Sequence, residues 1–328
     1  MTDQSVLASK VPLRLAGTTL LDYLSSRFRY KNRETWAGLI AAGVVTVNDE
    51  PGRPGLKLRH GDLVAYAVEL KEPPVDTRII VLHDEPAFAV AIKPGQLPSH
   101  ADGNFIKHTF IHLIQGMLKK GPGDARLVHR LDRETSGLMI VSRDKEAHAN
   151  LMRQFAAGTV EKTYTAVVTG RIGQERFEVS GPLGRDPASA ISVRHALVPA
   201  DTPGAKDSRT EFVVEQVLKD ATVVRCIPHT GRTNQIRVHL TSIGHPIVGD
   251  KLYGKTDEEF LAFVRHVRAG GDPGYAGHAE TTRQLLHAST LSFDHPKTGE
   301  RVTFTAELPF DIRDYISMHR EPAPRVQP

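Results

Sequence analysis

An aspartate that lies between two arginines is the residue of this sequence best suited to chemistry. Asp132 follows Arg130 and precedes Arg133 within the stretch from Leu127 to His148. Two cations this close to a carboxylate favour its ionised form. Such a group is most often part of a solvated ion-pair cluster on a protein surface. The alternative is a carboxylate that is kept ionised because it takes part in catalysis.

The residues around Asp132 predict a loop between ordered elements. Residues 135–137, Thr-Ser-Gly, predict a turn, and the apolar run 138–141 predicts a buried strand. Ser142 or Asp144 is expected to cap a helix that follows. Loops on rigid scaffolds often carry catalytic groups. The local pattern is therefore compatible with an active-site carboxylate as well as with a surface ion pair.

A strand with a basic and an aromatic side chain on one face comes next. Residues 161–170 alternate with a period of two, so that Lys162 and Tyr164 share a face with two apolar residues. A tyrosine that alternates with a lysine is unusual in a dry core. By itself the pattern does not decide between an interior tyrosine with a satisfied hydroxyl group and a side chain that faces a site.

A short helix is predicted to carry a third chemical group. Thr233 or Asn234 is expected to cap it, and Gly244 is expected to end it. Arg237 lies beside the apolar positions of this helix, and Arg232 lies in the turn that leads into it. The simplest interpretation is an ordinary amphipathic helix with an arginine on its surface.

These three stretches, in chain order, resemble the RluA family of RNA pseudouridine synthases. The sequence His-Arg-Leu-Asp followed by Thr-Ser-Gly-Leu at residues 129–138 resembles the active-site motif of that family. Lys-x-Tyr-x-Ala-x-Val-x-Gly at residues 162–170 resembles its second motif, and Gly-Arg-Thr-x-Gln-Ile-Arg-x-His at residues 231–239 resembles its third. The resemblance covers about residues 78–317.

The resemblance implies a role for one residue in each motif. Asp132 would be the catalytic carboxylate, and Arg237 would pair with it, which keeps a carboxylate ionised and aimed. Tyr164 would pack on the target base and help in proton transfer. An aromatic side chain under an extruded uracil offsets the cost of removing that base from its stack. Which atom of the substrate Asp132 acts on is left open.

The fold implied by the resemblance is α+β, with a large mixed or antiparallel sheet. The strand-rich pattern without regular βαβ alternation agrees with this class. Residues 181–210, rich in Gly, Pro, Asp and Ala, are expected to form a long irregular excursion. Isomerisation of uridine to pseudouridine involves no redox change and no net hydrolysis, so we predict no cofactor. His108 and His112 are expected at positions i and i+4 of a helix, a spacing that can bind zinc, but no third ligand stands nearby, so we also predict no metal.

The N-terminal part of the chain predicts a small separate module. Helices are expected from Thr18 or Thr19 and over residues 32–42, with strands at residues 44–48 and 61–66. This layout resembles the S4 RNA-binding module, although Asp49-Glu50 stands where that pattern commonly has glycine. Residues 27–33 hold four cations and two aromatic residues, which is typical either of a solvated helix end or of a nucleic-acid surface.

The sequence divides into five regions. They are a flexible N-terminus at 1–12, an S4-like domain at 13–70, a Pro-rich linker at 71–77, a catalytic domain at 78–318 and a flexible tail at 319–328. Two groups of side chains are predicted to contact RNA or the target base: Arg130, His129, Lys162 and Arg232 in the catalytic domain, and Arg27, Arg29, Lys31 and Arg33 in the S4-like domain.

Composition limits the remaining possibilities. The 328 residues are 40% hydrophobic and carry a net charge of +4, which suits a polyanionic partner without requiring one. The single cysteine, Cys226, cannot form an internal disulfide and is expected to be buried. No signal peptide is apparent, and no apolar run approaches the roughly 20 residues that span a membrane. We expect a cytoplasmic protein, and nothing demands more than a monomer.

The predicted function is the isomerisation of specific uridines in structured RNA. Large-subunit ribosomal RNA is the first candidate substrate, and transfer RNA remains open. One alternative is a non-catalytic RNA-binding or ribosome-assembly factor that keeps the fold. A second alternative is a base-excising hydrolase, which would release free uracil.

Overall fold

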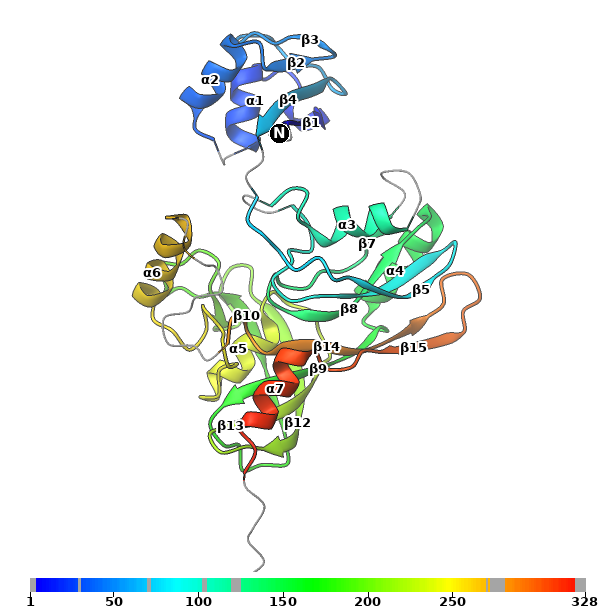
Figure 1. Ribbon diagram of the computed structural model, residues 1–328, viewed down its shortest axis with the longest axis vertical. Coiled ribbons are helices and arrows are strands. Elements are labelled where there is room, and N and C mark those ends of the chain that lie inside the picture. Colours follow the sequence, from blue (N-terminus) through cyan, green and yellow to red (C-terminus); the bar gives the residue numbers. More distant parts are fainter. Residues whose placement is uncertain are drawn as a thin grey trace, which may run out of the picture. The chain divides into compact units, whose positions relative to one another are not determined.

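A computed structural model describes residues 4–28, 31–69, 72–101, 105–118, 125–269, 271 and 281–321. The chain divides into two compact units (Figure 1). The first unit contains residues 1–74 together with residues 101–107, and the second contains residues 75–100 and 108–328. The division after Pro74 falls inside the expected linker.

The assignment of residues 101–107 to the first unit was not expected, and hydrogen bonds explain it. The Glu72 carboxylate accepts hydrogen bonds from the backbone N–H groups of Ile106 and Lys107, at 2.9 and 2.8 Å. This carboxylate therefore ties a distant loop to the end of the first unit.

The first unit packs helices against a small antiparallel sheet. Thr19 and Asn32 cap the two helices, each by accepting a hydrogen bond from a backbone N–H. Trp36 and Tyr66 are buried in the core between the helices and the sheet. The strand order is β1-β4-β2-β3. The elements are β1 (Gln4–Lys10), a 3-10 turn (Leu13–Leu15), α1 (Leu20–Arg27), α2 (Arg33–Ala41), β2 (Val45–Val47), β3 (Glu50–Pro51) and β4 (Leu63–Glu69).

The expectation of a flexible N-terminus was wrong for the residues that form β1. This strand pairs with β4 along its whole length, from Gln4 opposite Glu69 to Lys10 opposite Leu63. Leu7 packs against the core of the unit, while Val6 is exposed. Backbone pairing with the neighbouring strand β4 thus holds most of this segment in place. The pattern of hydrophobic residues in the sequence does not reveal such pairing.

The second unit is built on one large mixed sheet. Among the described residues it has eleven strands, in the order β11-β10-β12-β13-β9-β14-β8-β6-β5, with β15 paired to β14 and β7 paired to β8. The pairing of β8 with β14 is parallel and the other pairings are antiparallel. The expected α+β class with a mixed sheet is confirmed. The strands are β5 (Ile80–Asp84), β6 (Phe88–Lys93), β7 (Arg126–Leu127), β8 (Ser136–Ser142), β9 (Glu161–Thr169), β10 (Arg176–Arg185), β11 (His195–Leu197), β12 (Lys206–Val217), β13 (Ala221–Pro228), β14 (Leu286–Asp294) and β15 (Arg301–Thr305).

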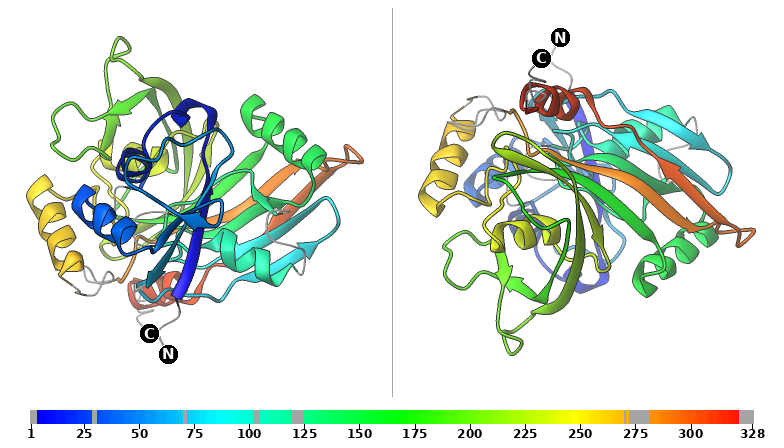
Figure 2. Two further views of the ribbon diagram at one scale, coloured as in Figure 1. Left: turned by 90° about the horizontal axis from the view of Figure 1, so that it is seen from above. Right: turned by 90° about the horizontal axis from the view of Figure 1, so that it is seen from below.

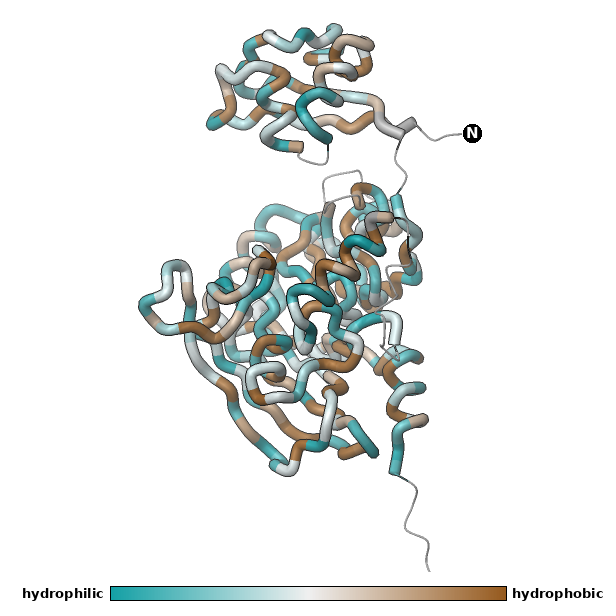
Figure 3. Tube along the Cα trace, turned by 90° about the vertical axis from the view of Figure 1, so that its left-hand side faces the viewer, coloured by the Kyte–Doolittle hydropathy of each residue, from teal (hydrophilic) through white to brown (hydrophobic). Residues whose placement is uncertain are grey.

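Five helices accompany this sheet in the described part of the second unit. Helices α4 and α6 lie at opposite ends of the unit in both views of Figure 2. Helix α7 mixes hydrophobic and hydrophilic residues along its length (Figure 3) and buries Ile312, Tyr315 and Ile316. None of the described helices is both long and apolar enough to cross a membrane. The helices are α3 (Phe110–Met117), α4 (Lys145–Ala157), α5 (Gln235–Ser242), α6 (Asp257–Arg268) and α7 (Phe310–Met318).

Two local expectations for this unit were wrong. Residues 181–210 are not a long irregular excursion, because they contain the end of β10, all of β11 and the start of β12. Glycine and proline are accommodated there: Gly181 adopts a φ of 150°, and Pro182 accepts a hydrogen bond from the N–H of Val198. His108 precedes α3, whose N-cap is Thr109, so that His108 and His112 do not share a helical face.

Candidate active site

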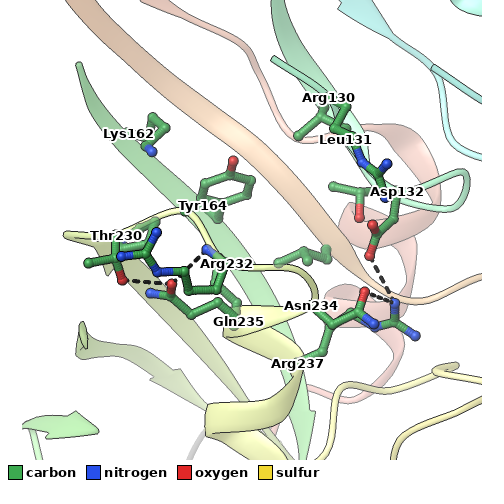
Figure 4. A pocket seen from close by; sticks show the side chains of 15 residues that line it. Arg130, Leu131, Asp132, Lys162, Tyr164, Thr230, Arg232, Asn234, Gln235 and Arg237 are labelled. Carbon is green, nitrogen blue, oxygen red and sulfur yellow. Dashed lines mark hydrogen bonds and ion pairs between the residues drawn. The ribbon is translucent and has the colours of Figure 1, made fainter. Parts of the chain in front are cut away.

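One cavity brings together the residues singled out from three distant stretches of the sequence. Its volume is about 110 Å³, and Asp132, Tyr164 and Arg237 all contribute to its lining. Asp132 and Arg237 point toward each other on one side, while Tyr164 and Lys162 project from the neighbouring strand β9 (Figure 4). The sheet and α5 thus assemble in space what the sequence spreads over about a hundred residues.

The shortest polar contact between two of these residues is an ion pair. The Arg237 Nη1 atom donates a hydrogen bond to Oδ2 of Asp132 at 2.8 Å. The Asp132 side chain is 31% exposed and the Arg237 side chain 12%. The carboxylate is therefore accessible from the cavity while its partner is largely enclosed. A charge-assisted hydrogen bond of this kind fixes the direction of the carboxylate.

Arg237 is itself held by a second carboxylate. Its Nε and Nη2 atoms donate to the two oxygens of Asp250, at 2.7 and 2.9 Å, in a bidentate pair. The Asp250 side chain is fully buried, and its Oδ1 also accepts from the N–H groups of Leu252 and Tyr253. Burial alone would lower the pKa of Arg237, but the charge and hydrogen bonds of Asp250 and the charge of Asp132 raise it. The guanidinium is thus a permanent cation.

Asn234, at the start of α5, is the third side chain that binds the Arg237 guanidinium. Asn234 occupies the N-cap position in a left-handed conformation, with φ at 58°, and its side chain makes no cap hydrogen bond. Its Oδ1 instead accepts from Nη1 of Arg237 at 2.9 Å, and its Nδ2 donates to the Tyr253 hydroxyl. The Tyr253 ring centroid lies 4.8 Å from the Arg237 guanidinium carbon. The expectation of an ordinary side-chain cap by Thr233 or Asn234 was therefore wrong.

The turn before α5 is organised by Gln235. Its Oε1 accepts from the Arg232 N–H and from the Thr230 hydroxyl, at 3.0 and 2.7 Å. Its Nε2 donates to the carbonyl of Arg209 and to the hydroxyl of Thr210 on β12. Thr230 and Arg232 line the cavity, so this buried amide fixes one of its walls.

The loop that carries Asp132, residues 128–135, is held by side chains at the end of strand β6 and just after it. We refer to this segment as the Asp132 loop. The Ser99 hydroxyl donates to the carbonyl of Leu131 and accepts from its N–H, at 2.6 and 3.1 Å. The fully buried Lys93 donates to three backbone carbonyls, one of which belongs to Arg133. Burial, followed by the charge of Arg283, lowers the pKa of Lys93 well below its ordinary value. These hydrogen bonds fix the backbone on both sides of Asp132.

A second set of contacts holds the Asp132 loop from the side of β14. The Lys251 ammonium donates to the Glu134 carboxylate at 2.6 Å, and the Gln284 amide donates to the Thr135 hydroxyl at 2.8 Å. The expected turn at residues 135–137 does not form, because Ser136 and Gly137 already belong to β8. Gly137 has φ at 119°, and a Cβ atom there would lie 2.3 Å from the carbonyl oxygen of Ala288. A glycine is required for β8 and β14 to approach this closely.

Tyr164 and Lys162 form the wall opposite Asp132. Both side chains are half-buried on β9. Burial, together with the negative charge of Asp132, raises the pKa of Tyr164, so its phenol stays neutral. Burial lowers the pKa of Lys162. The two positions share a face of the strand as the period-two pattern predicted.

The other residues predicted to contact RNA in this unit differ in position. Arg130 is exposed on the cavity rim, and Arg232 is half-buried in its wall. His129 does not line the cavity: its Nε2 accepts from the N–H of Ile140 at 2.9 Å, and its ring stacks on Phe155. Burial lowers the pKa of His129 to about 3, so its ring is neutral. The geometry gives His129 a part in holding the Asp132 loop.

The described residues among the predicted RNA contacts of the first unit lie between the end of α1 and the start of α2. Arg27 is exposed, with its guanidinium 5.7 Å from the Phe28 ring centroid. Arg33 pairs with Asp22 at 2.6 Å, and Lys31 is half-buried. Arg29 lies outside the described residues.

Several residues that support the site were missed by the sequence reasoning. Asp250, Asn234 and Lys93 all contact Arg237 or the Asp132 loop. The local signals in the sequence are Lys-Pro-Gly at residues 93–95 and Gly-Asp-Lys-Leu-Tyr-Gly at residues 249–254. Within the described residues, no group of three or more His, Cys, Asp or Glu is arranged to hold a metal ion.

Comparison with known proteins identifies relatives that cover most of the chain. Residues 87–242 match the RNA pseudouridylate synthase family. The chain is 33% identical over 321 residues to the ribosomal large subunit pseudouridine synthase D of Neisseria meningitidis serogroup B, covering 94% of this chain and 81% of that protein. It is 31% identical over 311 residues to the protein of the same name from Zymomonas mobilis, covering 90% and 92%. The solved structure of human RNA pseudouridylate synthase domain containing 1 is 26% identical, with a TM-score of 0.56 over 73% of this chain and 87% of that one. The chain belongs to the family of RNA pseudouridine synthases.

Proposed function

We propose that this enzyme isomerises specific uridines of large-subunit ribosomal RNA, with Asp132 as its catalytic carboxylate. The observation that carries the assignment is the ion pair between Asp132 and Arg237 in a cavity that also contains Tyr164. An accessible carboxylate paired with and aimed by an enclosed arginine is what carboxylate-based chemistry at a sugar or a base requires.

The reaction is balanced without an external reagent. The N1–C1′ bond of uridine breaks, the uracil rotates within the cavity, and C5 forms a new bond to C1′. The proton lost from C5 is matched by the one that N1 gains, so the product is an isomer of the substrate. Asp132 acts at the sugar or the base, and the neutral Tyr164 phenol lies on the opposite wall, where it stacks on the uracil and assists the proton transfer.

The target uridine must leave its stack before Asp132 can reach it. Base extrusion costs a few kcal/mol, which stacking and hydrogen bonds in the pocket offset. Arg130 is exposed at the rim of the cavity, where its side chain binds a phosphate or occupies the position that the base has vacated. Lys162 and Arg232 supply further positive charge in the walls.

The choice of large-subunit ribosomal RNA rests on the relatives and on the first unit. Two bacterial relatives that match over most of their length are named ribosomal large subunit pseudouridine synthases. We propose that the first unit is an S4-like RNA-binding module in which Arg27, Lys31 and Arg33 contact RNA. Phosphate contacts of this kind position a protein on RNA without reading its sequence.

The test uses purified protein and large-subunit rRNA extracted from cells that lack the gene. Wild-type protein should produce pseudouridine, and Asp132→Asn should lower the rate by at least about a thousandfold, since an essential nucleophile or base is lost. RNA binding by Asp132→Asn should stay within about twofold of wild type. Free uracil is measured in parallel. Release of uracil in place of pseudouridine would show a hydrolase, and full turnover by Asp132→Asn would refute the role of this carboxylate.

A further inference from the structure

A second, larger cavity adjoins the active-site cavity. It has a volume of about 480 Å³ and lies between the last turns of α4 and the turn that precedes α5. Lys162, Thr230, Gly231 and Arg232 line both cavities. A chain that occupies the first cavity therefore has a direct route into the second. We refer to this second cavity as the α4 groove.

One side of the α4 groove is an apolar surface with an aromatic ring. Phe155 is half-buried, with its ring stacked on His129, and Met152 is 44% exposed. Ala156 and Ala157 are exposed on the same turn, and their small side chains leave this surface open. A flat base can lie against an aromatic and thioether surface of this type.

The other side of the α4 groove carries positive charge. The Lys162 ammonium lies 5.7 Å from the centroid of the Phe155 ring, and Arg232 donates from Nε to the carbonyl of Asp207. Among the described residues, neither Lys162 nor Arg232 forms an ion pair with a carboxylate. Both cations are therefore available to a phosphate beside the apolar surface.

A third cavity, which Asp132 also lines, is less suited to an RNA strand. It measures about 260 Å³ and lies against α6. The carboxylates of Asp132 and Glu134 line it, and its basic residues are paired with acidic ones: Lys251 and Arg133 with Glu134, and Arg237 with Asp250 and Asp132. Phosphates are repelled by carboxylates, so electrostatics favours the α4 groove as the path of the strand.

We propose that the α4 groove binds the nucleotide next to the isomerised uridine. Its base stacks on Phe155 and Met152, and the phosphate that links it to the target nucleotide lies between Lys162 and Arg232. This inference rests on the proposed function, because it takes the first cavity to hold the target uracil. The groove then helps to hold the strand while the target base is extruded.

A cross-linking experiment locates the RNA in this groove. The chain has one cysteine, Cys226, which is buried, so Met152→Cys introduces one accessible thiol. The full-length variant is labelled with a benzophenone maleimide and irradiated with large-subunit rRNA from cells lacking the gene, and the cross-linked nucleotide is mapped. Met318→Cys on α7 is the control, because Met318 is exposed and lines none of the three cavities.

The expected cross-link falls within two nucleotides of the uridine that the wild-type protein isomerises, and the control gives none there. A cross-link only at a distant position, or none from a variant that still modifies the RNA, would overturn the proposal for the groove. If unlabelled wild-type protein forms no pseudouridine, the proposed function fails, which is a separate result.

A kinetic comparison gives an independent test. Met152→Glu places a carboxylate where the base and phosphate are expected, and it should lower kcat/KM by about tenfold, mainly through KM, given the usual strength of base stacking. Met318→Glu makes the same change on another exposed helical position and should leave both constants unchanged. Equal kcat/KM values for Met152→Glu and wild type would contradict the proposal.

Discussion

At the scale of single residues, the site depends on how Arg237 is held. Its guanidinium has three side-chain partners, Asp132, Asp250 and Asn234, and lies over the Tyr253 ring. Asp250 is fully buried and takes two of the hydrogen bonds, so it fixes the plane of the guanidinium. Of the two hydrogen bonds that Nη1 donates, one goes to Asn234 and the other sets the position of the Asp132 carboxylate. We therefore propose that Asp250 is a positioning residue for the reaction.

Substitution of Asp250 tests this arrangement. Asp250→Asn leaves a largely enclosed arginine without its bidentate partner, and breaking a buried ion pair in this way typically costs about 3–5 kcal/mol of unfolding free energy. Below its unfolding temperature, the variant should lose kcat by at least about tenfold with little change in KM. Denaturant titration and steady-state kinetics measure the two effects. Wild-type kcat in the variant would show that Asp250 serves stability alone.

The hydroxyl group and the aromatic ring of Tyr164 can be tested separately by two substitutions. Tyr164→Phe keeps the ring and removes the hydroxyl, so kcat should fall by about a hundredfold, a typical effect of losing an acid–base group. Its KM should change little. Tyr164→Leu also removes the aromatic surface and should raise KM as well, since base stacking contributes about 1–3 kcal/mol. If Tyr164→Phe has the same kcat and KM as wild type, a role for the hydroxyl group is excluded.

The family resemblance singled out Asp132, Tyr164 and Arg237 but not the residues that hold them. Asp132, Tyr164 and Arg237 stand in three recognisable motifs, and the structure places all three in one cavity. Asp250 and Lys93 carry no comparable local pattern, because their importance depends on which distant backbone and side-chain groups they reach. Asn234 was predicted to cap a helix, and only tertiary structure shows that its side chain turns to Arg237.

At the scale of elements, α5 and the strand β12 form a buried polar junction. His239 on α5 is fully buried, with its two ring nitrogens 2.9 Å from the hydroxyls of Thr210 and Ser208. Burial lowers the pKa of His239 from 6.5 to about 4. Since α5 also carries Arg237, the state of this junction affects the position of the guanidinium.

The titration of His239 predicts a loss of stability in acid. Between pH 6.5 and about 4 the unfolded chain binds a proton at this position and the folded chain does not. The stabilisation is complete above pH 6.5 and is lost as the pH falls toward 4, with a total of about 3 kcal/mol for one histidine. Denaturant unfolding of wild type and His239→Gln across this range measures the difference. The variant should be less stable at pH 7 and show a flatter pH profile, and an unchanged slope would contradict the prediction.

Prediction of the elements succeeded where the sequence has a run of apolar residues. The strands expected at residues 138–141 and 161–170 are both present, and each buries several consecutive residues. It failed for β1, β10 and β11, whose segments contain polar residues, glycine or proline. Those strands are held largely by hydrogen bonds to a neighbouring strand, a property of the sheet that no local window of sequence contains.

At the scale of the whole molecule, the chain joins a catalytic unit to a small unit proposed to bind RNA. The separation was visible in the sequence because Pro73 and Pro74 interrupt regular structure. The return of residues 101–107 to the first unit was not visible, because it depends on contacts of Glu72 across more than thirty positions. If the first unit binds RNA and the second unit carries out the reaction, changes of charge on the first unit should affect RNA binding and leave the chemical step unchanged.

Reversal of one exposed charge tests the RNA-binding role of the first unit. Arg27→Glu should raise KM several-fold, leave kcat within about twofold of wild type, and reduce the slope of binding against salt concentration by about one. Arg313→Glu on α7 is a matched reversal of an exposed arginine in the other unit and should have little effect on either constant. A fall in kcat without a change in KM for Arg27→Glu would argue against an RNA-binding role for this surface.

The central claim is that Asp132 converts uridine to pseudouridine in large-subunit rRNA, and mapping of pseudouridine in cells tests it most directly. RNA from cells lacking the gene is compared with RNA from the same cells after rescue by wild type or by Asp132→Asn, with equal protein levels verified. We predict that specific positions in large-subunit rRNA lose pseudouridine in the deletion and regain it only with wild type. Restoration by Asp132→Asn, or no change at any position after deletion, would contradict the account.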